Sequence, residues 1–224
     1  MDVASGVQGI ALHFQERPRK FSSPLWISTN EDALEMAAGD IDGDGDVDLA
    51  YSTFEIRGLL VVRFQTDQKT FPQRDLVLSP GDEGTASYLR MRDLDADGDL
   101  DLVGRTSSQI AIFLQESPGK FSPTPLLLGS ALTTSFPSDL DITDFDRNGL
   151  LDLVSLHEVS PLGVNLAVFS QLGPGLFSSP LTWKLPGLGL PWDLVLEDID
   201  GDGDPDLVIG DYGEDRIVIS YGNR

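Results

Sequence analysis

The amino-acid sequence predicts an all-β protein built as a β-propeller of four four-stranded blades, either a closed ring or part of a larger ring. Two observations lead to this prediction. An acidic nine-residue loop occurs four times, at 40–48, 93–101, 144–152 and 198–206. Short segments in which apolar and polar residues alternate stand on both sides of each loop, which is typical of strands. We therefore expect residues 1–224 to form one domain.

The spacing of the loops measures the repeat. Their first aspartates are 53, 51 and 54 residues apart, a period that suits one four-stranded blade. A strand that ends in Gln recurs at 10–15, 60–65, 110–115 and 166–171, and 216–221 is a final version that ends in Tyr. Each of the first four is followed by a phenylalanine, at Phe21, Phe71, Phe121 and Phe177. These elements give each repeat four strands, one of which tolerates proline as a sheet edge does.

The loops carry the donor atoms of a calcium site. Positions 1, 3, 5 and 9 hold carboxylate or amide oxygens, position 6 is glycine, and position 7 offers its backbone carbonyl. Hard oxygen ligands around a tight turn are the set that Ca²⁺ prefers, so we expect about four ions, one per repeat. Asn148 replaces an aspartate in the third loop, which should bind most weakly. The predicted ligands are Asp40, Asp42, Asp44, Asp46 and Asp48; Asp93, Asp95, Asp97, Asp99 and Asp101; Asp144, Asp146, Asn148, Leu150 and Asp152; and Asp198, Asp200, Asp202, Asp204 and Asp206.

Other interpretations of the loops are weaker. Asp and Gly are common in ordinary turns, but carboxylates this dense repel one another unless a cation lies between them. The chain has no cysteine and two histidines, which disfavours zinc. Magnesium stays open, although it usually keeps several waters and a phosphate. An EF-hand needs a glutamate at position 12, where this chain has Tyr51, Gly104, Ser155 and Ile209. The acidic motifs also lie too far apart for a calcium-binding β-helix of nonapeptide repeats.

The loop, the strand after it and the Lys-Phe turn resemble the FG-GAP/VCBS repeat, the Ca²⁺-binding blade of integrin-α-type β-propellers. The resemblance extends from about Ile10 to Tyr221. It implies that each loop joins the innermost strand of a blade to the next strand. The Gly-Ala-Pro element that gives the family part of its name is missing after all four loops, so the chain is more similar to the bacterial VCBS type.

Closure of the ring stays open at this point. In the implied strand order the chain begins with a third and a fourth strand, continues with three complete blades, and ends with the first three strands of another. Residues 21–28 could complete the last blade, in which case 10–15 would be surplus because 216–221 fills the same place. Propellers of the resembled family more often have about seven blades, so the alternatives are a fragment of a longer domain or a homo-oligomer that completes the ring between chains.

Charge and composition indicate an extracellular module. Four Ca²⁺ ions would reduce the formal net charge from −22 to −14. The surface stays acidic, which argues against nucleic acid or an anionic membrane as partner. Extracellular calcium modules have dissociation constants of roughly 10⁻⁴–10⁻³ M, and such sites would be empty in the cytosol. The N-terminal residues do not resemble a signal peptide, so we expect any export signal to have been removed or to lie outside this sequence. No apolar run is long enough to cross a bilayer.

The sequence favours binding over catalysis. His13 and His157 lie in unrelated settings, the first inside a repeated strand and the second expected in a loop, so we predict no enzyme. Carboxylate pairs for glycoside hydrolysis stay possible, but the clustered acids are already explained as metal ligands. We expect an extracellular protein or carbohydrate interaction and adhesion module. The alternatives are a lectin with sugar pockets repeated between blades, and a designed or truncated repeat array without a ligand of its own.

Ligand-binding residues are expected where the repeat varies. The third and fifth positions before the loops differ among the repeats, and these positions supply the candidates Tyr88, Arg90, Asp139 and Asp193. A solvated channel is the alternative for these side chains. Trp26 and Trp183 stand at matching places, which predicts core or edge packing, with sugar stacking as the alternative. The same two interpretations apply to Trp192, which is next to Asp193.

Overall fold

The described part of the chain consists of β-strands and turns. The computed structural model describes residues 9–53, 58–66, 70–80, 87–106, 108–129, 136–159 and 163–222. Within these ranges one short 3-10 segment, Tyr212–Glu214, interrupts an otherwise all-β chain. The all-β prediction is therefore confirmed.

Four antiparallel sheets form the body of the molecule. Within each sheet the strands follow one another in chain order, from the inner strand to the outermost one. Three of them have four strands and the last has three. Their strands are β5 (Ala33–Gly39), β6 (Asp48–Thr53), β7 (Leu60–Arg63) and β8 (Asp75–Leu78); β9 (Ser87–Arg92), β10 (Asp101–Arg105), β11 (Ile110–Phe113) and β14 (Leu126–Leu128); β15 (Phe136–Thr143), β16 (Asp152–Val159), β17 (Gly163–Phe169) and β20 (Leu181–Leu185); and β21 (Pro191–Glu197), β22 (Asp206–Asp211) and β23 (Arg216–Ser220).

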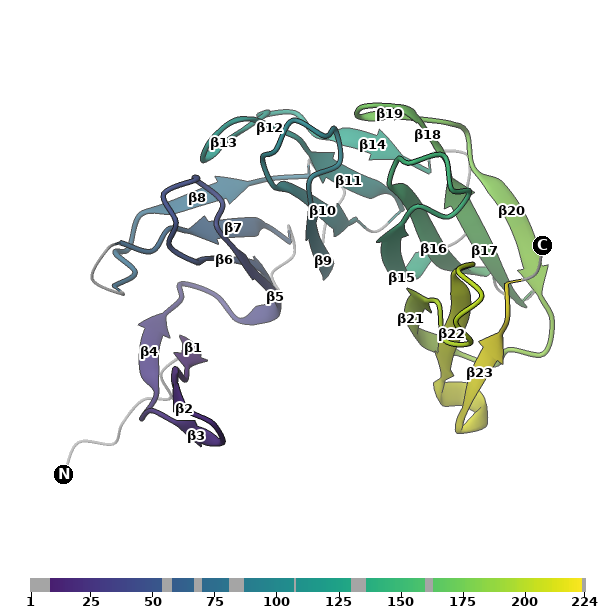
Figure 1. The fold of residues 1–224 in the computed structure, drawn as a ribbon, viewed down its shortest axis with the longest axis horizontal. Helices are drawn as coiled ribbons and strands as arrows, with labels where there is room; N and C mark the ends of the chain where they lie inside the picture. The colour runs from purple at the N-terminus through teal and green to yellow at the C-terminus, as the bar shows by residue number, and fades with distance from the viewer. Residues whose placement is uncertain are drawn as a thin grey trace.

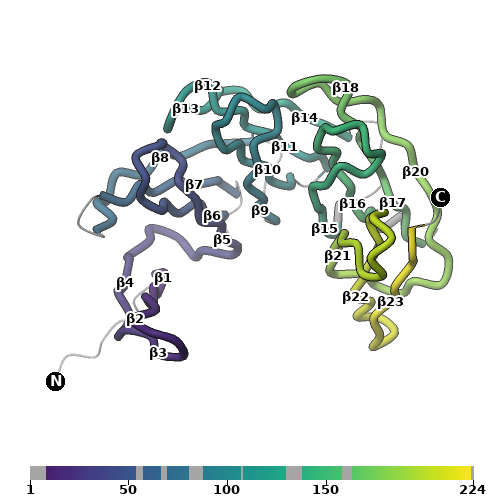
Figure 2. Tube along the Cα trace, viewed as in Figure 1, coloured from purple at the N-terminus to yellow at the C-terminus, as the bar shows by residue number. Residues whose placement is uncertain are grey.

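The four sheets follow one another as the blades of a β-propeller (Figure 1). The tube view traces an open arc, with the first strands of the chain at one end and the last sheet at the other (Figure 2). The inner strands β5, β9, β15 and β21 lie on the concave side of this arc. The predicted four-bladed arrangement is confirmed, and each acidic loop joins an inner strand to the strand after it.

The hydrophobic core lies between successive sheets rather than within one centre. One cluster joins Ala50 and Val62 of the first sheet to Leu89 and Met91 of the second. Equivalent clusters join the second sheet to the third and the third to the last. Side chains point alternately to the two faces of a strand, so each middle blade has two apolar faces and is buried on both sides. This explains why β11 of the second blade is buried along its whole length.

The N-terminal strands do not complete the last blade. β4 (Leu25–Ser28) pairs with β1 (Gly9–Leu12), and the described residues contain no pairing between β4 and β23. Ile10 and Ile27 of this two-stranded unit pack on Leu49, Tyr51 and Val61 of the first sheet. The possibility that residues 21–28 close the ring with the last blade is therefore wrong for this structure, because β4 buries its apolar side chain next to β1.

Small hairpins stand between the third and outer strands. They are β2 (Gln15–Arg17) with β3 (Lys20–Phe21), β12 (Gln115–Ser117) with β13 (Lys120–Phe121), and β18 (Gln171–Gly173) with β19 (Leu176–Phe177). Three of the repeated phenylalanines therefore end hairpin strands, and Phe71 follows the isolated bridge between Thr66 and Thr70 at the matching place.

Candidate metal centres

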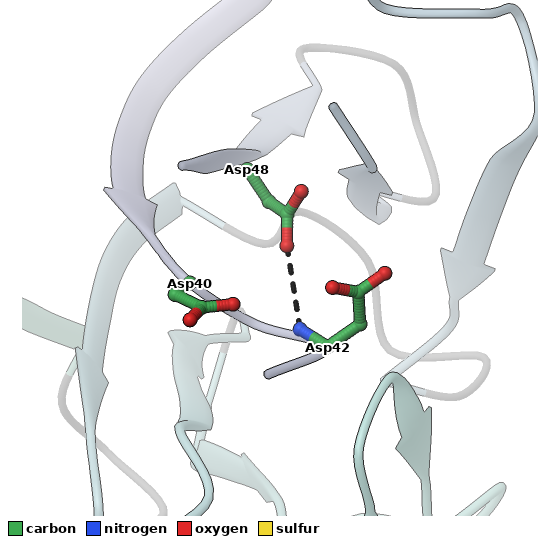
Figure 3. Close-up of side chains that lie close together, drawn as sticks. All are labelled: Asp40, Asp42 and Asp48. Carbon is green, nitrogen blue, oxygen red and sulfur yellow. Dashed lines mark hydrogen bonds between the residues drawn. The ribbon is translucent and has the colours of Figure 1, made fainter. Parts of the chain in front are cut away.

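Each acidic loop brings three carboxylates together. The aspartates at loop positions 1, 3 and 9 have oxygen atoms within 4.8 Å of one another in every repeat. Figure 3 shows the first group, in which Asp40, Asp42 and Asp48 surround one small space. The four groups are Asp40, Asp42 and Asp48; Asp93, Asp95 and Asp101; Asp144, Asp146 and Asp152; and Asp198, Asp200 and Asp206. Each group could hold one metal ion, which gives one candidate site per blade.

The aspartate at position 9 is the structural anchor of the loop. Asp48 is fully buried, and its Oδ2 accepts hydrogen bonds from the backbone N–H groups of Ile41 (2.9 Å) and Asp42 (3.3 Å). Its Oδ1 accepts a third bond from the N–H of Gln65, just beyond the third strand (2.8 Å). The same brace to the end of the third strand recurs in the other loops, from Gln115 to Asp101, Gln171 to Asp152 and Gly222 to Asp206. The carboxylate thus ties the acidic loop to the sheet.

The glycine at position 6 turns the loop back toward the first aspartate. Gly45 has φ +91°, in the left-handed region that glycine adopts without a steric penalty. Its N–H donates to Asp40 Oδ2 at 3.0 Å, and Gly98, Gly149 and Gly203 make the same bond to the first aspartate of their loops. One oxygen of each first aspartate therefore fixes the turn.

Positions 5 and 7 contribute less directly. Asp44 Oδ1 accepts a hydrogen bond from the N–H of Asp46 at 2.8 Å, and the other loops repeat this bond from Asp99 to Asp97, Leu150 to Asn148 and Asp204 to Asp202. The position-5 side chains stand outside the group of three converging carboxylates. Their role as ligands, and that of the position-7 carbonyls, stays a prediction.

Several converging oxygens lack a partner within the protein. Asp93 Oδ1, Asp95 Oδ1 and Asp144 Oδ1 are buried and accept no hydrogen bond. Burial and the nearby carboxylates together raise the pKa of Asp42 and Asp95, and burial raises the pKa of Asp101 to about 6. Unpaired buried oxygens and crowded negative charge are both costly. A cation at the centre of each group would relieve both, so the residues fit a metal ion.

Neighbouring blades also touch the loops. The N–H of Gly119, in the hairpin of the second blade, donates to the carbonyl of Ile41 in the first loop at 3.3 Å. Gln171 Nε2 of the third blade donates to the Leu94 carbonyl in the second loop at 2.6 Å. Arg147 of the third loop pairs with Asp204 of the last at 2.6 Å. The repeated Gln was visible in the sequence, but its use in joining blades depends on contacts between distant segments.

The four predicted ligand-binding residues lie on three consecutive inner strands. Arg90 on β9 forms an ion pair with Asp139 on β15 at 3.1 Å, and Arg105 lies 5.2 Å from the centre of the Tyr88 ring. Asp139 is buried and accepts the N–H of Leu194 on β21 at 2.7 Å. Burial raises the pKa of Asp139 to about 7, although the positive charge of Arg90 lowers it; a hydrogen bond with Asp193 adds to the rise.

These contacts give Asp139 and Arg90 a role in joining blades. Asp139 connects the second, third and last sheets through Arg90 and the amide of Leu194. Asp193 is exposed at the end of this series of inner strands. Ligand binding by the four residues stays a prediction.

The two histidines lie in separate environments. His157 belongs to β16 rather than to a loop, so its expected place was wrong; it is buried, and its Nε2 lies 2.6 Å from Ser155 Oγ. Burial, with a smaller effect of Arg105, lowers the pKa of His157 to about 4, which keeps the imidazole neutral at pH 7. His13 Nδ1 lies 3.0 Å from the carbonyl of Ser22.

The tryptophans are at the surface rather than in the core. Trp26 and Trp183 lie on the outer strands β4 and β20 and are exposed, so the edge interpretation is confirmed and the core interpretation is wrong. Trp192 is also exposed and stacks on Tyr212, with ring centroids 4.8 Å apart.

Comparison with known proteins identifies the repeat. Residues 93–155 match the family model described as FG-GAP-like repeat. This segment begins at the first aspartate of the second loop and ends just after the third, so it covers one full period. No curated protein matches the chain. The described residues contain no helix with the length and apolar character needed to cross a membrane.

Proposed function

We propose that this chain is a calcium-stabilised, non-enzymatic β-propeller that serves as an extracellular interaction module. The observation that carries the proposal is the fourfold group of three converging aspartates, in which buried oxygens of the second and third groups lack a hydrogen-bond partner. Each group is made of carboxylate oxygens alone, which are hard ligands suited to Ca²⁺ or Mg²⁺. Ca²⁺ takes six to eight oxygens in flexible geometry, and the position-5 side chain, the position-7 carbonyl and water would supply the remainder.

An ion in each loop would act on structure rather than on a substrate. The loop connects the inner strand to the second strand, and its position-9 aspartate holds the end of the third. A bound cation would therefore fix three strands of the blade relative to one another. We infer an extracellular location from the expectation that these sites bind Ca²⁺ as weakly as extracellular modules do, since such sites would be filled outside the cell and empty in the cytosol.

Calorimetric titration with Ca²⁺ after chelation, with thermal unfolding of both forms, tests the proposal. We expect about four ions per chain and a higher unfolding temperature for the loaded protein, because a ligand that binds only the folded state stabilises it. Mg²⁺ is the matched comparison and should bind more weakly, because it demands near-ideal octahedral geometry. A chain that binds no Ca²⁺ and unfolds at the same temperature with and without the ion would disprove the proposal.

A lectin is the second candidate function, favoured by the exposed aromatic residues. Trp26 and Trp183 occupy matching outer-strand positions, and Trp192 with Tyr212 lines a shallow surface hollow that also includes Arg216. Exposed aromatic rings beside polar groups suit the apolar faces of sugar rings. Binding to a glycan array that Trp183→Ala reduces and Val77→Ala leaves unchanged would support this function; Val77 is an exposed outer-strand residue without an aromatic ring.

A further inference from the structure

One hydrogen-bonded contact joins the inner strands at two of the three junctions between blades. Glu35 Oε2 on β5 accepts the N–H of Leu89 on β9 at 2.8 Å, and Asp139 Oδ2 on β15 accepts the N–H of Leu194 on β21 at 2.7 Å. In both cases the acceptor lies five residues before its own loop and the donor lies four residues before the next loop. The contact thus uses the same repeat positions at both junctions and holds the inner strand of one blade against the inner strand of the next. At the junction of β9 and β15 the acceptor position holds Tyr88, and the ion pair of Arg90 with Asp139 joins the strands instead.

Within the described residues, no further inner strand covers the acceptor side of the last blade. Asp193 on β21 stands at the acceptor position, and Val195, two residues on, is 45% exposed. In the third blade the equivalent of Val195 is Asp141, whose Oδ2 accepts the N–H of Leu196 on the next inner strand at 2.9 Å. Asp193 and Val195 therefore form a face that, in the preceding blade, is covered by a further inner strand.

At the other end of the arc, the first blade exposes the donor side of the contact. Met36 on β5 stands at the donor position and is 56% exposed, whereas its equivalents Leu89, Leu140 and Leu194 are at most 3% exposed. Val47, at loop position 8, is also exposed, although its equivalents Leu100 and Leu151 pack against the preceding blade. Exposed apolar side chains at positions that are buried or packed in the other blades favour an interaction site.

The strands available at the two ends are complementary. The last sheet has inner, second and third strands, β21, β22 and β23, and lacks an outer strand among the described residues. The N-terminal pair β1 and β4 packs on the first sheet as the third and outer strands of a preceding blade, with no inner or second strand beside it in the described ranges. Together β21, β22, β1 and β4 make one complete four-stranded blade.

Charge favours the same combination. The N-terminal unit, residues 9–28, contains Arg17, Arg19 and Lys20 with Glu16 as its one acidic residue, for a net charge of +2 with His13 neutral. Residues 191–220 of the last blade contain ten acidic residues and Arg216 alone as a base, for a net charge of −9. Opposite charges on two surfaces raise the rate of encounter and orient the partners.

We propose that the last blade of one chain binds the β5 end of a second copy of this chain, head to tail. Asp193 accepts the N–H of Met36 from the second copy, Val195 covers Met36, and the N-terminal pair of that copy supplies the outer strands of the shared blade. β1 and β23 both correspond to a third strand, so one of them moves aside. β23 is the strand that moves, because four of its five residues are exposed whereas β1 buries Ile10. Its move releases the pairing with β22 and the hydrogen bond from Gly222 to Asp206. Such a contact joins different surfaces and closes a ring or extends a filament.

Sedimentation velocity of the calcium-loaded chain over a wide range of concentrations tests the proposal. We expect the wild-type chain to associate as concentration rises, and Val195→Asp and Met36→Asp each to remain monomeric. Val77→Asp, a valine of similar exposure on the outer strand β8, is the control that should associate as the wild type does. Circular dichroism of each variant checks that it is folded, as expected for substitutions at exposed positions.

A mixture of the two defective chains separates this geometry from others. Each variant keeps one intact end, so Val195→Asp mixed with Met36→Asp should form a one-to-one dimer and nothing larger. A symmetric contact between identical faces would not be restored by mixing. The proposal is overturned by a wild-type chain that stays monomeric at all concentrations, by variants that associate as the wild type does, or by a mixture that stays monomeric.

Discussion

Each acidic loop depends on one buried carboxylate that acts as a structural brace. Asp101 accepts the N–H groups of Leu94 within its loop, at 2.8 Å, and Gln115 beyond the third strand, at 2.7 Å. Its neighbour Asp99 at position 7 has a side chain that takes no part in the converging group. Asp99 and Asp101 are separated by one residue. Substituting each in turn therefore compares a carboxylate that braces the loop with a nearby one that does not.

Replacing Asp101 with alanine should destabilise the metal-free protein by roughly 2–4 kcal/mol, because two backbone donors lose a charged acceptor in a buried place. The substitution should also remove calcium binding at the second loop. Urea unfolding in chelator and calorimetric titration measure the two effects. Asp99→Ala is the control and should keep both the stability and the number of ions. Equal stability of the two variants would show that the brace is energetically unimportant.

His157 makes the stability of the molecule depend on pH. Its folded-state pKa of about 4 lies below the ordinary value of 6.5, so the unfolded chain binds a proton more readily between these values. The neutral, buried imidazole makes its full contribution to the stability of the folded state above pH 6.5. This contribution, roughly 3 kcal/mol in total, is lost as the pH falls toward 4. Asp139 acts in the opposite sense, because its raised pKa favours the folded state as pH falls below about 7.

The difference between wild type and His157→Gln isolates the histidine, because Asp139 is common to both. Urea unfolding at pH 7 and at pH 4.5 should show that the wild type loses more stability than the variant over this interval. Equal losses in the two proteins would mean that the imidazole is protonated in the folded state.

At the scale of elements, hairpins of one blade support the acidic loop of the blade before it. Gly119 in the β12–β13 turn has φ +71°, and a Cβ at this position would lie 3.2 Å from the Cβ of Asp42. Gly175 in the β18–β19 turn has φ +66°; a Cβ there would lie 3.7 Å from the Cβ of Asp95 in the second loop and 3.1 Å from Leu114. The blades are therefore coupled through their acidic loops as well as through their apolar faces.

Gly119→Ala should destabilise the protein and weaken calcium binding at the first loop, because the added methyl group both strains the turn and displaces Asp42. Gly187→Ala is the matched control, with φ +82° and no atom within 4 Å of the added Cβ. The control should show the backbone cost alone, about 1 kcal/mol, and keep all calcium sites. Calorimetric titration of both variants compares them; an unchanged first site in Gly119→Ala would disprove the coupling.

The sequence predicted local features well and long-range ones poorly. The converging aspartates at positions 1, 3 and 9 were predictable, because nine consecutive residues around a glycine turn contain the whole motif. The pairing of β4 with β1 and the buried ion pair of Arg63 with Asp75 were not predictable. Arg63 stands where the next two repeats have Phe113 and Phe169, and nothing in its neighbouring residues indicates that it also donates to the carbonyl of Ser28.

At the scale of the whole molecule, the negative charge is concentrated in four acidic loops that are spread around the arc. The formal net charge of −22 falls to −14 when four Ca²⁺ ions bind, and the change falls where carboxylates lie within 4.8 Å of one another. A large net charge destabilises a compact state through self-repulsion. Calcium should therefore stabilise the protein in two ways, by coordination within each loop and by reducing repulsion among the blades.

Salt separates these two contributions. Sodium chloride screens repulsion but does not occupy a carboxylate group as Ca²⁺ does, so it should raise the unfolding temperature of the chelated protein more than that of the calcium-loaded protein. A variant with asparagine at the first aspartate of all four loops has a net charge of −18 and keeps an oxygen acceptor for each position-6 glycine. It should bind Ca²⁺ weakly, and its response to salt should be smaller than that of the chelated wild type. Differential scanning calorimetry at low and high salt gives each slope. Equal slopes for the chelated and loaded wild type would mean that loop repulsion contributes little and that calcium acts through coordination alone.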